Sequence, residues 1–336
     1  MNKAGHSTAF EDLQIGRRIQ CPGLRTVTDG EIACYLSLFG DPTPRFSGPE
    51  RLVNPLIVFH IAFGQATHTL GSALMRSRKF KDVQWHRPLK VGAVLRTDLQ
   101  VIGLRETAAH SGMAWVRLST RDEAGLVVLT MVWSLELFKR QKAPTPWADQ
   151  PMVPSIRDEV EPADLALIRV KQLPLPTETG GRWLFSDYQP REQLRHRLGA
   201  MLSTNSQRQF CNQYQNAAPL FVDPHATRGQ MIFHPGYLLS LAYSCAYSGF
   251  ENRLGMAAIN NFTCPNQAKS GQVIYGYSEI LDCQSLRNSK LGALRCRLFA
   301  IADERPKPGC TALEAGRYRS NVLLDVDFWE LIAKDG

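Results

Sequence analysis

Two long apolar segments, each followed by stretches in which apolar and polar residues alternate, dominate the hydrophobic pattern of this chain. Residues 53–75 are mostly apolar and contain no proline after Pro55, which predicts a long buried helix. A shorter helix is predicted before it, ending near Phe39, because Thr28 is followed by Glu31 at the spacing of a capping box.

Strands are predicted where apolar and β-branched residues run or alternate between glycine and aspartate turns. After the first long helix these stretches are residues 93–103, 114–121 and 126–138. The same order returns in the second half, where a long helix is predicted over residues 235–250 and strands over 273–283, 293–303 and 322–331. We therefore expect an α+β unit that occurs twice.

A sequence motif is repeated as well. Residues 10–13 read Phe-Glu-Asp-Leu and are followed by Asp41, and 175 positions later residues 185–188 read Phe-Ser-Asp-Tyr and are followed by Asn216. The distance from the Phe to the Asp or Asn is 31 residues in both copies. This period is far longer than that of solenoid repeats, so we infer a duplicated domain.

The length of 336 residues also fits two domains. Seven prolines lie between positions 142 and 182, and two glycines at 180 and 181 close this segment, which predicts an extended connector. We expect an N-terminal domain over residues 8–141, a connector over 142–181 and a C-terminal domain over 182–336.

The composition narrows the class of protein. Residues 1–7 are polar and lack the apolar run of a signal peptide, and the longest apolar stretch, residues 126–138, is too short to span a bilayer. The eight cysteines include no Cys-x-x-Cys pair and no zinc-ligand cluster, which favours free thiols in a reducing compartment. We predict a soluble, cytoplasmic protein with no membrane partner and no metal site.

The net charge of +8 indicates an anionic partner, for which nucleic acid, a membrane surface and a phosphorylated carrier such as coenzyme A are the candidates. The densest basic runs, residues 76–81 and 191–197, are short and lack a nucleic-acid-binding motif, so solvated faces are favoured and nucleic acid is not expected. The sequence contains no glycine-rich dinucleotide or phosphate loop and no Gly-x-Ser-x-Gly elbow, and no cofactor is predicted.

Several segments resemble the MaoC-like (R)-specific enoyl-CoA hydratase and dehydratase family, and more narrowly its two-copy members. They lie in collinear order over nearly the whole chain, at residues 10–12, 15–16, 58–64, 101–105, 214–216, 258–260, 274–281 and 292–297. The resemblance implies a double hot-dog fold, in which a sheet wraps a long central helix twice. It also implies an internal pseudo-dimer, which can pair further as a homodimer, and an acyl thioester of coenzyme A or of an acyl carrier protein as substrate.

Both copies depart from the family's hydratase motif, Asp-x-Asn-Pro-x-His. The second copy has Asn216, Ala218 and Phe221 where the family has the catalytic Asp, the Asn and the catalytic His. The first copy keeps Asp41 but has Phe46 in place of the His. Adding water to an enoyl thioester needs a base for the attacking water and a proton source at Cα. An amide can orient water but cannot take its proton, and phenylalanine can do neither.

The resemblance places the rest of the site at the start of the second long helix. His234, in a Phe-His pair that repeats residues 59–60, is the candidate replacement acid or base beside Asp41 and Asn216. The Gly236 N–H is the candidate oxyanion donor, with the side chains of His60 and Tyr237 as further substrate-binding candidates.

Structural interpretations of the same residues stay open. Asp41 follows a glycine and precedes a proline, which is ordinary turn chemistry. For His60 a buried histidine bonded to the backbone is favoured, and His234 and Gly236 also fit simple packing at a helix start.

The leading hypothesis is a hydratase or dehydratase-type lyase that acts on an acyl thioester through a degenerate Asp/His site. One alternative is a cyclase or other addition-elimination enzyme of a biosynthetic pathway, for which positioning and one acid or base suffice. The other alternative is a non-catalytic thioester-binding protein, because a fold does not fix a function once its site has changed.

Overall fold

A computed structural model describes residues 8–48, 51–165, 179–286 and 290–334 of the chain. Part of the predicted connector, residues 166–178, lies outside the described residues.

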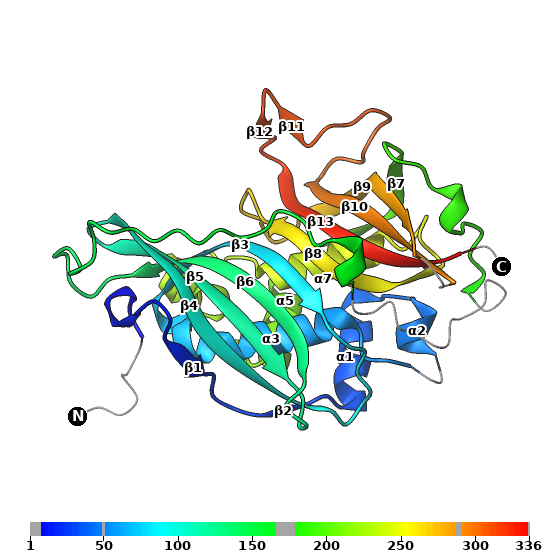
Figure 1. Cartoon of the computed structure of the whole chain (residues 1–336). Coiled ribbons are helices and arrows are strands. Elements are labelled where there is room, and N and C mark those ends of the chain that lie inside the picture. Colours follow the sequence, from blue (N-terminus) through cyan, green and yellow to red (C-terminus); the bar gives the residue numbers. More distant parts are fainter. Residues whose placement is uncertain (1–7, 49–50, 166–178, 287–289, 335–336) are drawn as a thin grey trace.

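The first half contains a long buried helix, two shorter helices and a set of strands (Figure 1). The helices are α1 (Asp29–Phe39), α2 (Pro44–Ser47) and α3 (Pro55–Leu70). The strands are β1 (Arg18–Gln20), β2 (Arg25–Thr26), β3 (Leu74–Trp85), β4 (Val94–Ala108), β5 (Ser111–Arg121) and β6 (Val127–Phe138). The described residues of this half also contain the 3-10 turns η2 (Phe10–Asp12) and η3 (Gly71–Ala73).

The second half repeats this order. Its helices are α5 (Thr204–Gln213), α6 (Pro219–Val222) and α7 (Pro235–Cys245). Its strands are β7 (Gln193–Met201), β8 (Arg253–Thr263), β9 (Val273–Ser285), β10 (Leu291–Ala302) and β13 (Val322–Ala333), with a small hairpin of β11 (Leu313–Glu314) and β12 (Arg317–Tyr318) between the last two. Three 3-10 turns are η4 (Pro162–Asp164), η6 (Phe185–Asp187) and η7 (Pro224–Thr227).

The two halves share one antiparallel sheet. Its strand order is β1-β4-β5-β6-β3-β8-β13-β10-β9-β7, and the halves join where β3 pairs with β8, with Phe80 opposite Phe262. Helix α3 packs against β4, β5, β6 and β8, and α7 packs against β7, β9, β10 and β13. Each half is therefore a long helix wrapped by an antiparallel sheet (Figure 1), and the predicted α+β double hot-dog is confirmed.

The repeated Phe-x-Asp motif has the same local structure in both halves. Asp12 Oδ2 accepts a hydrogen bond from Ala9 N, and Asp187 Oδ2 accepts one from Leu184 N, each at 2.8 Å. The aromatic rings of the two motifs lie directly on glycines of the central sheet, Phe10 on Gly112 and Phe185 on Gly292. A side chain at either glycine would overlap the ring, so the duplication extends to packing.

The hydrophobic pattern misses the short strands β1, β2, β11 and β12 and also three long ones, β3 in the first half and β7 and β8 in the second. The helix predicted over residues 53–75 ends at Leu70, and the helix predicted over 235–250 ends at Cys245, so that β3 and β8 begin soon after. Strand β3 includes the basic run 76–81, and shifts in its register with β6, together with a positive φ of 50° at Asp82, break its period of two. Pairing with β6 on one side and β8 on the other forms the strand despite this irregular pattern.

The long helices meet at equivalent positions. His60 and Ser240 are the sixth residues of α3 and α7, and His60 Nε2 lies 2.7 Å from Ser240 Oγ. One turn further along α3, Gly64 touches the Tyr214 carbonyl so closely that a Cβ would lie 1.9 Å from its oxygen. The two long helices therefore contact each other at equivalent positions of the duplicated unit.

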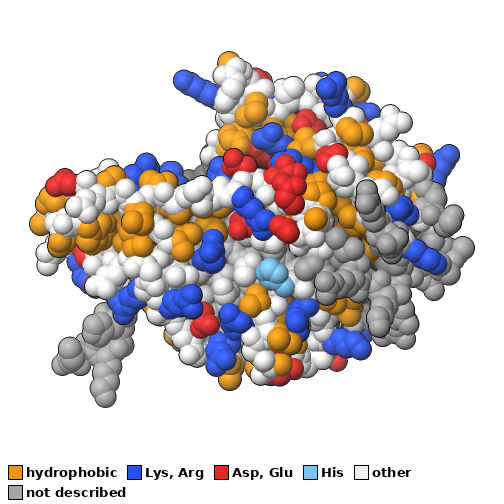
Figure 2. Space-filling view, in the orientation of Figure 1, with side chains coloured by type: hydrophobic (Ala, Val, Ile, Leu, Met, Phe, Trp, Pro, Cys, Tyr) orange, Lys and Arg blue, Asp and Glu red, His pale blue; other side chains and the backbone are white. Residues whose placement is uncertain are grey.

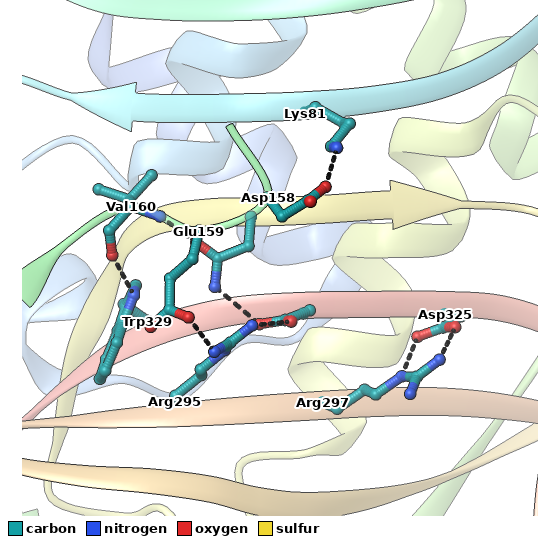
Figure 3. Close-up of polar contacts among 10 residues, drawn as sticks. Lys81, Asp158, Glu159, Val160, Arg295, Arg297, Asp325 and Trp329 are labelled. Carbon is teal, nitrogen blue, oxygen red and sulfur yellow. Dashed lines mark hydrogen bonds and ion pairs between the residues drawn. The ribbon is translucent and has the colours of Figure 1, made fainter. Parts of the chain in front are cut away.

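The connector is fixed to the outer face of the sheet. It pairs with β4 through Leu104 and Met152, and further along it reaches the second half (Figure 3). There Val160 N donates to Asn260 Oδ1 and Trp329 Nε1 donates to Val160 O, both at 2.8 Å. The described part of the connector therefore contacts strands of both halves.

Charged side chains of both signs are mixed on the molecular surface. In Figure 2 the Lys and Arg side chains are spread over the visible face among acidic ones. Arg295, for example, forms ion pairs with Glu159 and Asp327 on the outer face of the sheet (Figure 3). In the described part of the chain, no helix has the length and the apolar character needed to cross a membrane.

The contact at Gly64 gives a test of the helix packing. Gly64→Ala is expected to lower the free energy of unfolding by about 1–3 kcal/mol, because the methyl group overpacks against Tyr214. The matched control is Gly30→Ala, at an exposed position of α1 where a Cβ would meet Thr28 Oγ1 at an ordinary contact distance of 3.7 Å and alanine is expected to stabilise by about 0.4–1 kcal/mol. Urea unfolding of both variants checks this, and a Gly64→Ala protein that gains stability like the control contradicts the packing described.

Candidate functional site

The residues before α3 form a fully satisfied chain of hydrogen bonds. Asn54 caps the helix, with its Oδ1 accepting from Leu56 N at 2.9 Å. Its Nδ2 donates to Asp41 Oδ2 at 3.1 Å, and Asp41 Oδ1 accepts from Thr43 N at 3.1 Å. Every donor in this chain meets an acceptor because Asp41 supplies two oxygens and no proton.

Asp41 is also paired with a cation from the second half. Arg253, at the start of β8, donates from Nη2 to Asp41 Oδ1 and from Nε to Thr43 Oγ1, each at 2.9 Å. Its guanidinium lies 3.8 Å from the centre of the Tyr243 ring, and both Asp41 and Arg253 are 1% exposed. Asp41 thus accepts hydrogen bonds from Asn54, Arg253 and both donors of Thr43, so both of its oxygens are engaged within the protein.

A second buried carboxyl group lies beside Arg253. Glu330 of β13 accepts from the Tyr243 hydroxyl and from Gly255 N, each at 2.8 Å. Burial raises the pKa of Glu330 to about 7, although the neighbouring Arg253 acts in the opposite direction. This group therefore titrates near neutral pH inside the core.

The second copy has the same layout at the start of α7, with different residues. His234 caps the helix, and its Nδ1 accepts from Gly236 N at 3.0 Å. His234 Nε2 lies 3.1 Å from Asn216 Nδ2, and Asn216 Oδ1 accepts from Ala218 N at 3.0 Å. His234 thus occupies the place of Asn54, and Asn216 the place of Asp41.

Because His234 and Asn216 stand where the first copy has Asn54 and Asp41, the number of protons that these side chains carry differs between the two copies. Backbone N–H groups stand at both ends of the chain of contacts, so His234 Nδ1 and Asn216 Oδ1 must both be acceptors. The neutral imidazole then carries its proton on Nε2, facing the Asn216 amide N–H groups. Exchanging the oxygen and nitrogen of the Asn216 amide would not remove this donor–donor contact, because the amide nitrogen would then face Ala218 N. An asparagine side chain has only one acceptor atom. The pair therefore presents two N–H donors to each other.

Aromatic rings enclose this pair. The imidazole centre of His234 lies 4.7 Å from the ring centres of Phe63 and Phe221, and 5.0 Å from that of Phe210. Only 2% of His234 is exposed, and burial lowers its pKa to about 3. His234 is consequently neutral over the physiological pH range. Phe221, which stands where the family has its catalytic His, forms part of this wall.

The other two candidates, His60 and Tyr237, contact different neighbours. The His60 ring faces Gly236, where a Cβ would lie 2.8 Å from His60 Nδ1, and this nitrogen has no hydrogen-bond partner. Burial and the nearby His234 lower the pKa of His60 well below its ordinary value. The Tyr237 ring packs on the far side, against Phe39 and other rings of the core. The structure brings together Asn216, His234, Gly236 and His60.

Asp41 lies apart from this group, at the start of the other long helix. The apparent equivalence of the two Phe-His pairs is wrong, because His234 corresponds to Asn54 and His60 corresponds to Ser240. The sequence does contain a signal for the correct correspondence, namely the proline that follows each capping residue, Pro55 and Pro235.

Sequence reasoning also missed Arg253 and Glu330, for which no motif gives a signal. Among the described residues, no group of three His, Cys, Asp or Glu side chains is arranged to hold a metal ion. The site as described consists of neutral and amide groups only.

Comparisons with known proteins agree over the full length of the chain. No protein-family model matches it. It is 29% identical over 340 residues to the mesaconyl-CoA hydratase of Cereibacter sphaeroides, covering 97% of this chain and 98% of the relative. It is also 29% identical over 354 residues to the beta-methylmalyl-CoA dehydratase of Chloroflexus aurantiacus, covering 99% of each.

Solved structures show the same architecture. A MaoC domain protein dehydratase from Chloroflexus aurantiacus superimposes with a TM-score of 0.92 at 28% identity, covering 100% of both chains. A Mycobacterium tuberculosis protein described as a double hot-dog has a TM-score of 0.72 at 21% identity, covering 97% of this chain and 98% of that one, which supports the fold alone.

The raised pKa of Glu330 predicts a pH dependence of stability. The folded protein keeps a proton on Glu330 up to about pH 7, whereas the unfolded chain releases it near pH 4.3. The contribution of Glu330 to the free energy of unfolding is therefore complete at pH values below its pKa in the unfolded chain. It is lost, on the order of 3 kcal/mol in total, as the pH rises through its pKa in the folded protein. Glu330→Gln is expected to reduce this dependence of the free energy of unfolding on pH, which is measured by urea unfolding between pH 4 and pH 8.

The matched control is Glu314→Gln on the exposed hairpin strand β11, which should keep the wild-type pH profile. Equal pH profiles for Glu330→Gln and the wild type would show that Glu330 is not the titrating group.

Proposed function

Because the chain is a full-length homologue of the MaoC-like double hot-dog hydratases and dehydratases, we propose that it is a lyase that adds water to, or removes it from, an acyl thioester. The observation that carries this proposal is the contact between Asn216, in the frame of the hydratase motif, and His234, the capping residue of α7. Thioesters of coenzyme A are the first candidates, because both curated relatives are named for them. Acyl-carrier-protein thioesters are the second.

His234 is the proposed acid/base group of this reaction. As a neutral imidazole with a proton on Nε2, it can donate to an oxygen that gains negative charge. Asn216 offers a second N–H at the same point, 3.1 Å from His234 Nε2. Two converging donors in a site closed to water suit the substrate hydroxyl oxygen that leaves as water in the dehydration direction.

A hydratase also needs an acceptor for the proton of the attacking water. His234 Nδ1 is engaged by Gly236 N–H, which is also the predicted oxyanion donor. We propose that the thioester oxygen takes over the Gly236 N–H during the reaction. That exchange leaves Nδ1 free to take the proton of the attacking water while the helix start stabilises the enolate oxygen. The imidazolium formed then gives a proton to Cα, which restores the neutral ring.

The aromatic wall controls entry to this site. Asn216 is 9% exposed and His234 is 2% exposed, so a substrate reaches them only when a ring moves. Phe221, on the short helix α6, is the candidate for this movement because it contacts His234 and lies next to the partly exposed Leu220 and Val222. Such a closed site favours water exclusion once the substrate is bound.

A second candidate function is an addition or elimination that uses no free water, such as a cyclisation. It is favoured by one observation, the amide of Asn216 where a water-activating carboxylate is expected. In such a reaction the nucleophile belongs to the substrate, and positioning with one acid or base is enough.

We also propose a cytoplasmic location. All cysteines in the described part of the chain, including Cys21 and Cys211 in the core, are free thiols, which supports a reducing compartment.

Turnover of enoyl thioesters tests the proposal. The wild-type chain is expected to consume crotonyl-CoA or mesaconyl-CoA, measured as loss of enoyl absorbance. His234→Asn should lower kcat by about 10²–10⁴-fold, because it removes the acid/base group. The variant keeps a side-chain oxygen for Gly236 N, as Asn54 does for Leu56. Asn216→Asp should raise kcat, because its carboxylate accepts the Nε2 proton.

The control is His225→Asn, on the exposed turn η7 outside the pair, which should leave kcat unchanged. Folded wild-type protein that turns over neither thioester contradicts the hydratase proposal and leaves the cyclase. Full activity in His234→Asn would instead place the chemistry elsewhere.

A further inference from the structure

A narrow cavity lies beside the first copy of the motif, at the start of α3 and away from the Asn216–His234 pair. Its volume is about 20 Å³, room for one small group. It is lined by two arginines and by mostly apolar residues: Arg45, Phe46, Leu52, Val53, Pro55, Val58, Trp85, Arg87, Pro88, Leu89 and Leu254.

Arg45 is a largely buried cation without a counter-ion. Its Nη1 donates to the Leu254 carbonyl at 3.3 Å, and its Nε has no partner and no contact with solvent. Within the described residues, no carboxylate lies at ion-pair distance from it; Glu330 acts only from further away. Burial lowers the pKa of Arg45 to about 10, which expresses the cost of this desolvated charge.

Arg87 supplies a second guanidinium to the same cavity. Its ion pair with Asp122 is long, at 3.4 Å, and its Nε is also buried without a partner. The third polar side chain of the lining, Trp85, donates its Nε1–H to the Pro55 carbonyl at 2.8 Å. The unused donors of the lining side chains therefore belong to the two arginines.

The remaining wall is apolar. It includes Phe46, which stands where the family's motif has a histidine, together with Val53 and Val58 at the start of α3. A guanidinium offers its Nε–H and one Nη–H as a side-on fork that matches the two oxygens of a carboxylate. The small volume admits a carboxylate head rather than a phosphate, so a short hydrocarbon stem would extend out of the cavity along its apolar lining.

We propose that this cavity binds the carboxylate of a short organic acid, with Arg45 and Arg87 as its hydrogen-bond donors. The carboxylate belongs either to a free acid or to the far end of an acyl thioester. The site is separate from the Asn216–His234 pair, since it lies at the first turn of the other long helix.

Calorimetric titration of the full chain with crotonate tests this site. The wild type is expected to bind crotonate and not crotonamide, its uncharged isostere. Arg45→Gln and Arg87→Gln should each weaken crotonate binding at least tenfold, and Arg45→Lys should weaken it less. The control is Arg105→Gln, an exposed arginine over the Trp115 ring, which should bind crotonate as the wild type does.

Thermal unfolding of each variant establishes that it is folded, and Arg87, being more exposed than Arg45, gives the safer variant. Absence of crotonate binding in the wild type, binding of crotonamide with equal affinity, or binding unchanged in both arginine variants overturns the proposal.

Kinetics with two thioesters separates the sources of the carboxylate. If it belongs to the substrate, Arg87→Gln raises the KM for mesaconyl-CoA and leaves the KM for crotonyl-CoA unchanged. If it belongs to a free acid, neither KM changes although crotonate binding is lost. The calorimetric result stands even when neither thioester is consumed, so failure of the proposed lyase activity remains distinguishable from failure of this site.

Discussion

The first turn of each long helix leaves a backbone N–H buried between the two halves of the molecule, and the residue before the helix proline must accept its hydrogen bond. Asn54 does this for Leu56, and His234 does it for Gly236. Each capping side chain then turns its second polar atom toward the motif residue, Asp41 or Asn216 in the two copies. The polar site of each half is therefore built from the requirements of a helix start.

The two copies meet this requirement with opposite results. In the first, a carboxylate closes the chain of donors and acceptors, and Arg253 from the other half neutralises it, so that Asp41 stabilises the join between the halves. In the second, an amide replaces the carboxylate and two N–H donors face each other inside an aromatic wall. We therefore propose that the first copy is structural and that the second keeps an unsatisfied pair, which a substrate oxygen can complete.

The sequence predicted the architecture well and the site only in part. The spacing of Asp41 and Asn216 from the repeated Phe-x-Asp motif indicated the duplication, because both are fixed by local packing. Five more residues separate Asn216 from Pro235 than separate Asp41 from Pro55. Because of this difference in spacing, the sequence did not show that the two capping residues are equivalent. Arg253 reaches Asp41 across the join between the halves, and no local pattern records a contact between segments so far apart. Strand β3 was missed because pairing on both sides forms it despite an irregular pattern.

The central claim is that His234 is a neutral imidazole with its proton on Nε2, facing the Asn216 amide. The most direct measurement is the ¹⁵N NMR spectrum of the His234 ring in the full chain between pH 5 and pH 8. The account predicts a neutral ring with Nε2 protonated and Nδ1 unprotonated throughout, since the pKa is lowered to about 3 and Gly236 N donates to Nδ1. A ring protonated on Nδ1, or an imidazolium that titrates within this range, would contradict it.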